Sequence, residues 1–224
     1  MFIGQLVKAI AEATGVPEAT VAVYTRVLRE SGLITSGARG VNAPKMTTLD
    51  AARVLLAMII TDKPSRAAEA VSDFGSLRSS QFTPHQSGKW ENFNFRKARK
   101  LPEDHTFEQA ICTLIDIYAF DNSKSYFQSA CPKIHPAFSY NPLCEITVRL
   151  FNIDAKINIP GGVYYYHDPL IITNRDPLSA EELTALTEAH LHKSDKYKSL
   201  IRVEKKVMAD VVDAIALAFR EDDH

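Results

Sequence analysis

The sequence predicts a mainly α-helical fold with an α+β carboxyl-terminal part. Apolar residues recur at intervals of three and four over most of residues 1–75, which is the spacing of amphipathic helices. Apolar and polar residues alternate at a period of two between residues 145 and 159, which indicates strands, and helical spacing returns from residue 180. We therefore expect helices at the front of the chain and a small antiparallel sheet with helices behind them.

Two helices joined by a tight turn are predicted near the amino terminus. The first ends at Thr14, where Gly15 permits the positive φ of a tight turn, and Ala11 is small enough to let a second helix cross closely. Pro17 suits the first turn of the second helix because its ring fixes φ and its missing N–H needs no intrahelical partner. The apolar faces comprise Leu6, Val7 and Ile10 on the first helix and Val16, Val21, Tyr24 and Leu28 on the second. This pattern predicts a helix-turn-helix.

A loop and a third helix follow. Residues 35–45 are small, glycine-rich and basic, and the apolar pattern restarts in a helix over residues 47–60. Thr47 is suited to cap the amino terminus of that helix, and Asp50 to lie at its positive end. The order of these elements is the layout of a winged helix-turn-helix domain, which we place at residues 1–75.

In this layout the chain resembles the winged helix-turn-helix regulators of bacteria and phage, and over roughly the first 60 residues it is similar to MerR-type domains. The resemblance implies that the second helix enters the major groove of double-stranded DNA. Short side chains let a helix backbone approach the groove, whereas arginine reaches guanine edges and phosphates. The residues expected to contact DNA are Glu18, Ala19, Ala22, Arg26 and Arg29 on the second helix and Arg39 and Lys45 in the loop. The alternative is an ordinary helical hairpin whose arginines are solvated.

The remainder of the chain divides into a linker and a second domain. Residues 76–101 contain many loop-forming residues, a basic run at 96–100 and several aromatic residues, and they predict a basic aromatic linker. Those aromatic residues either dock on a neighbouring domain or stack on nucleic-acid bases. Residues 102–224 predict an α+β dimerisation or effector domain. Its expected elements are a helix at 103–120, strands at 145–153, 155–159, 163–167, 170–173 and 198–203, a helix at 180–192 that begins with a Ser179–Glu182 capping box, and a helix at 205–219.

The formal net charge of −1 conceals an uneven distribution. Residues 1–100 carry 14 Lys and Arg against 8 Asp and Glu, whereas residues 101–224 carry 12 against 19. A basic half suits a polyanion, and an acidic half is repelled by one. We therefore expect DNA binding in the front half and a different role for the back half.

No pattern points to a membrane, a secretory pathway or a catalytic site. No apolar run approaches the ~20 residues of a membrane span and no signal-peptide pattern is present, which predicts a cytoplasmic protein. Cys112, Cys131 and Cys144 are widely spaced and predict neither a disulfide framework nor a zinc site. His190 and His192 lie two positions apart on a predicted helix, so we expect them to be solvated rather than to share a metal ion. The sequence predicts no metal, no cofactor and no enzymatic activity.

These observations together predict a sequence-specific transcriptional regulator that binds double-stranded DNA as a homodimer. One winged helix contacts too few base pairs to select a single site in a bacterial genome, and two-fold pairing doubles the contact. Two alternatives stay open: a DNA-binding protein for replication, packaging or partition, and a protein-interaction module built on a winged helix. The sequence identifies no small-molecule effector.

Overall fold

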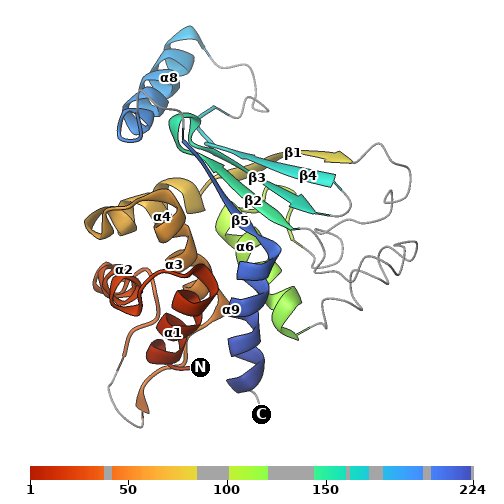
Figure 1. Ribbon diagram of the computed structural model, residues 1–224. Helices are drawn as coiled ribbons and strands as arrows, with labels where there is room; N and C mark the ends of the chain where they lie inside the picture. The colour runs from red at the N-terminus through yellow and green to blue at the C-terminus, as the bar shows by residue number, and fades with distance from the viewer. Residues whose placement is uncertain are drawn as a thin grey trace.

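A group of helices and a five-stranded antiparallel sheet make up the structure (Figure 1). The computed structural model describes residues 1–37, 42–84, 101–120, 144–159, 162–171, 179–198 and 203–222. Within these ranges it contains seven α-helices and five strands. This mixed composition agrees with the predicted presence of an α+β part, while the winged-helix assignment stays a prediction.

The front of the chain is helical. Its elements are α1 (Ile3–Thr14), α2 (Glu18–Glu30), α3 (Thr48–Ile60), the short 3-10 helix η2 (Pro64–Arg66) and α4 (Ala67–Gly75). Five residues predicted to face inward are buried, namely Leu6, Ile10, Val21, Tyr24 and Leu28. Thr47 caps α3 as predicted, because its Oγ1 accepts a hydrogen bond from the Asp50 backbone N–H at 3.2 Å.

The strands form one sheet in the order β1-β4-β3-β2-β5. They are β1 (Arg78–Pro84), β2 (Glu145–Arg149), β3 (Asp154–Ile159), β4 (Gly162–His167) and β5 (Glu204–Met208). The predicted β2–β3 hairpin is confirmed; its connection contains the 3-10 helix η3 (Leu150–Asn152) and Ile153, whose φ is +47°. Alternate residues such as Ile146, Ile157 and Tyr166 are buried. The apolar–polar alternation in the sequence therefore reflects a sheet with one face packed on the core.

Three further helices complete the described part: α6 (Phe107–Phe120), α8 (Ala180–Asp195) and α9 (Ala209–Asp222). α9 packs against both α1 and α6, and α6 packs against α3 (Figure 1). The first and last helices therefore lie side by side, although they are about as far apart in sequence as the chain allows. Buried apolar residues from α1, α3, α6, α9 and the sheet belong to one continuous core.

Several predicted elements differ from the structure. Residues 78–84, predicted as part of the linker, form the edge strand β1, which pairs with β4. The helix predicted over 205–219 begins only at Ala209, because residues 204–208 pair with β2 as strand β5. Leu170 and Ile171, predicted to begin a strand, lie in a turn. The predicted strand at 198–203, the basic run at 96–100 and Cys131 lie wholly or largely outside the described residues.

The prediction that His190 is solvated is wrong. Its ring Nδ1 lies 3.2 Å from a carboxylate oxygen of Asp168, and the His190 side chain is only 15% exposed. His192, two positions along α8, is exposed as predicted. Among the helices of the described residues, none combines the length and apolar character that crossing a membrane requires.

Candidate nucleic-acid interface

The turn between α1 and α2 is built on a single glycine. Gly15 has φ +70°, in the left-handed region, and its N–H donates to the Ala11 carbonyl at 2.9 Å. The Thr14 hydroxyl donates to the Ile10 carbonyl at 2.6 Å, so the last turn of α1 has extra hydrogen bonding. Pro17 then lies immediately before the first residue of α2. These features fix where α2 starts relative to α1.

The inner face of α2 is held firmly against the helical core. Val21, Tyr24 and Leu28 are buried, and the Tyr24 hydroxyl donates to the Thr61 carbonyl at 2.5 Å. Burial raises the pKa of Tyr24, and the nearby Asp62 carboxylate raises it further, so the hydroxyl stays protonated and keeps donating. With this face fixed, the opposite face of α2 has a defined orientation.

The outer face of α2 carries the side chains that the sequence assigned to DNA. Glu18, Ala19, Ala22, Arg26 and Arg29 are all exposed. The Arg26 guanidinium lies 3.9 Å from the Glu30 carboxylate one turn later, and both side chains are more than half exposed. An exposed pair of this kind contributes little free energy, so Arg26 can exchange this partner for a phosphate or a base at small cost. The outer face therefore combines short side chains with two exposed arginines, of which Arg26 is only loosely paired.

Two residues of α3 fix the ends of the loop that follows α2. The buried Asp50 carboxylate accepts from the Thr35 N–H at 2.8 Å and from the Thr47 N–H at 2.7 Å. The Arg53 guanidinium donates to the Leu33 carbonyl at 2.5 Å. The sequence indicated Asp50 only as a helix-end charge; its link to Thr35 crosses fifteen positions, which no local pattern can reveal.

The loop itself is described in part. Arg39 lies outside the described residues, and Lys45 is exposed at the end of the loop near α3. Residues 31–37 and 42–47 contain no strand, so the described part of the loop has no two-stranded wing. The structure thus places five of the seven predicted contact residues on the outer face of α2 and a sixth, Lys45, in the adjoining loop.

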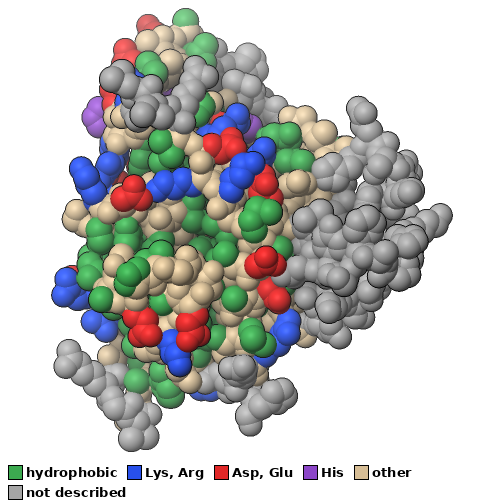
Figure 2. Space-filling model, in the orientation of Figure 1, with side chains coloured by type: hydrophobic (Ala, Val, Ile, Leu, Met, Phe, Trp, Pro, Cys, Tyr) green, Lys and Arg blue, Asp and Glu red, His purple; other side chains and the backbone are tan. Residues whose placement is uncertain are grey.

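Charged side chains of both signs are scattered over the face of the molecule that Figure 2 shows. In Figure 2 basic and acidic side chains are interspersed over the visible face, and the described residues there form no continuous patch of one sign. Any attraction to a polyanion on this face must therefore come from a few individual arginines and lysines rather than from a broad basic surface.

Among the described residues no group of three or more His, Cys, Asp or Glu side chains is arranged to hold a metal ion. Comparison with known protein families, curated proteins and solved structures finds no match to this chain. A function for this chain is therefore inferred from its own residues and their geometry.

Proposed function

We propose that this protein is a sequence-specific, double-stranded DNA-binding regulator of transcription, of bacterial or phage type, and that α2 is the helix that enters the major groove. One observation carries the proposal: α2 is anchored by a buried face, and its opposite face exposes Ala19, Ala22, Arg26 and Arg29. A rigid helix with short outward side chains fits a groove about 12 Å wide, and the arginines supply base-edge and phosphate contacts.

The proposal includes a homodimer formed through the back half of the chain. The excess of acidic residues after position 100 makes that half unsuited to phosphate, so it is available for another role. A two-fold dimer requires an inverted repeat whose half-sites are spaced by about one helical turn of DNA, ~10 base pairs, or a multiple. Sedimentation equilibrium with and without duplex tests this assembly, and a monomer that binds one half-site as tightly as two contradicts it.

The DNA-binding role is tested by selecting ligands from a pool of random duplexes and measuring the affinity of the selected sequence against salt concentration. Arg26→Ala should weaken binding to the selected duplex by about 5- to 150-fold, corresponding to ~1–3 kcal/mol, because it removes a groove contact. The fold should persist, because the Arg26 side chain is 60% exposed.

The chain offers a matched control on the neighbouring helix. Lys8 forms an exposed pair with Glu12 at 3.8 Å, with the same four-residue spacing as Arg26 and Glu30. Lys8→Ala removes one positive charge from α1 and should change affinity by less than about twofold. Equal losses of duplex affinity for both variants would mean that α2 is not the contact surface. The absence of salt-dependent affinity for any duplex would overturn the proposed function and favour a protein-interaction role.

A further inference from the structure

The attachment of α8 to the rest of the molecule is unusual among the described helices. Of its 16 residues only Ser194 is buried, and Leu183 and Leu191 are each about half exposed. In Figure 1 the helix stands at the end of the sheet beyond α4. Helices of globular proteins are normally held by a buried apolar stripe, so another kind of contact must hold α8.

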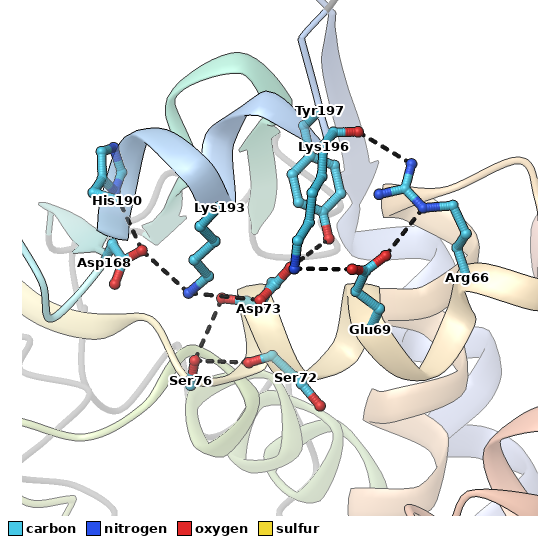
Figure 3. Close-up of polar contacts among 10 residues, drawn as sticks. All are labelled: Arg66, Glu69, Ser72, Asp73, Ser76, Asp168, His190, Lys193, Lys196 and Tyr197. Atoms are coloured by element: carbon cyan, nitrogen blue, oxygen red, sulfur yellow. Dashed lines mark hydrogen bonds and ion pairs between the residues drawn. The ribbon is translucent and has the colours of Figure 1, made fainter. Parts of the chain in front are cut away.

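The first such contact is centred on Asp168, just after β4. Its side chain is 1% exposed, and its Oδ2 lies 3.2 Å from His190 Nδ1 and 3.1 Å from Lys193 Nζ, both on α8 (Figure 3). Its Oδ1 accepts from the Leu170 N–H at 3.1 Å. The buried carboxylate is therefore satisfied largely by donors from α8, and losing them would leave a buried charge without its ionic partners.

A second contact joins the end of α8 to α4. Lys196 Nζ lies 2.9 Å from Glu69 Oε1 and 3.7 Å from Asp73 Oδ2, and Lys193 Nζ lies 3.8 Å from Asp73 Oδ1. The hydrogen bond from Lys196 lowers the pKa of Glu69, and the same bond raises the pKa of Lys196. Both groups are thus stabilised in their charged forms by this contact.

An aromatic ring lies beside these charges. Tyr197 donates from its hydroxyl to Asp73 Oδ2 at 2.9 Å, and its ring meets Phe74 edge-on with centroids 5.1 Å apart. The Arg66 guanidinium lies 5.2 Å from the centre of the Tyr197 ring and donates to the Lys196 carbonyl at 3.1 Å and to Glu69 at 3.1 Å. Arg66 is the last residue of η2, and both η2 and α4 pack against α2.

We propose that these contacts form a charge-operated switch, the α4–α8 clamp, with Glu69, Asp73 and Asp168 on one side and His190, Lys193 and Lys196 on the other. The clamp docks α8 when the carboxylates are ionised and releases it when they are neutralised. Substitution of Lys193, which removes its positive charge, should release α8 in the same way. Through Arg66 the docked state stabilises the η2–α4 support of α2 and so regulates the proposed DNA contact. That last step rests on the proposed function, whereas the docking itself does not.

The direction of the pH response follows from Glu69. Its pKa is lowered from 4.5 in the folded protein, so its contribution to docking is complete above that value and is lost as the pH falls through the lowered pKa. Neutralising Glu69 removes the carboxylate that pairs with both Lys196 and Arg66, so these two cations lose their common partner on α4. Acid should therefore release α8.

Hydrogen exchange of the full chain tests the docking, with amides of α9 as the internal reference. Lys193→Glu should lower the protection of α8 amides by about tenfold or more relative to α9, because it places a carboxylate against Asp73 and Asp168. Lys198→Glu is the matched control: Lys198 lies just after α8, is 65% exposed and pairs with Asp195 rather than with α4. It should change α8 protection by less than about twofold.

Two further measurements keep the proposal falsifiable if Lys193→Glu does not fold. Lys193→Met retains the aliphatic stem and should release α8 to a smaller extent. In the wild-type protein, protection of α8 should fall as the pH is lowered from 7 to well below 4.5, after correction for intrinsic exchange rates, while α9 stays protected. Equal effects of the variants at positions 193 and 198, or loss of protection in α8 only together with α9, would overturn the switch.

Duplex affinity then tests the link to α2. If the wild-type protein binds a selected duplex, Lys193→Glu should change its affinity by about threefold or more and Lys198→Glu should not. Altered α8 protection with unchanged affinity would overturn the link to DNA while leaving the docking switch intact. Absence of duplex binding by the wild-type protein would count against the proposed function and against that link, but not against the exchange result.

Discussion

Cys144 is the most deeply buried cysteine among the described residues, and its thiol gives a prediction at the scale of a single residue. Burial raises the pKa of Cys144 from 9.0 to about 12, and the neighbouring Glu145 carboxylate adds to the shift. Above pH 9 the unfolded chain loses this proton while the folded chain keeps it. The free energy of unfolding should therefore fall as the pH rises from 9 towards 12, with a limiting slope of about 1.4 kcal/mol per pH unit from this group.

Urea unfolding of the wild-type protein and of Cys144→Ala at pH 8, 9 and 10 measures this slope. Cys144→Ala should be less stable at pH 8, because it leaves a small cavity, but its stability should fall less steeply between pH 9 and 10. Restricting the comparison to this interval limits the contribution of Tyr118 and Tyr166, whose pKa values burial raises from 10.0. Identical slopes for the two proteins would show that Cys144 is accessible to ionisation in the folded state.

At the scale of elements, two glycines on or beside α1 should respond oppositely to alanine. Gly15 ends the helix with φ +70°, whereas Gly4 lies within it, and a Cβ at either position would meet no atom within 4 Å. Gly15→Ala should destabilise the protein by about 1–2 kcal/mol, because the left-handed conformation is strained for alanine. Gly4→Ala should stabilise it by up to ~1 kcal/mol, because alanine loses less backbone entropy in a helix.

Thermal or urea unfolding of both variants checks the pair, and Gly15→Asn refines it because asparagine tolerates the left-handed region better than alanine. Gly15→Asn should lie between the wild-type protein and Gly15→Ala. Since steric contact is excluded at both sites, unchanged or increased stability of Gly15→Ala would mean that a left-handed Gly15 does not end α1. A loss of stability in Gly4→Ala would contradict the helical position of Gly4.

Elements were predictable where the chain carries its own local signal. Thr47 with Asp50 and Ser179 with Glu182 form the predicted helix caps, because a cap is a contact between residues three positions apart. β1 was missed because Arg78–Pro84 has no apolar alternation, and its pairing with β4 supplies the stability that its sequence lacks. β5 was missed because residues 205–208 also fit the helical pattern predicted over 205–219, whereas their pairing with β2 delays the start of the helix to Ala209.

At the scale of the whole molecule, the contacts that sequence could not predict join distant segments. The outer face of α2 follows from periodicity within one helix. The α4–α8 clamp, by contrast, brings together residues 66–73, 168 and 190–197, and no pattern in any one of these segments specifies the other two. The packing of α9 on α1 likewise joins the two ends of the described chain.

This packing predicts how a fragment of residues 1–77 behaves. The fragment keeps α1 to α4 but loses α9, which packs on α1, and α6, which packs on α3. Two faces that are buried in the full chain would then meet water, and short helices without tertiary packing are marginal. The fragment should show reduced helical circular dichroism and no cooperative urea transition, whereas the full chain should unfold cooperatively. The contradicting result is a fragment that unfolds cooperatively and protects α1 and α3 from hydrogen exchange as well as the full chain does. The first 75 residues would then form an independent domain. The shared core would be an interface between two domains, and neither domain would need it to fold.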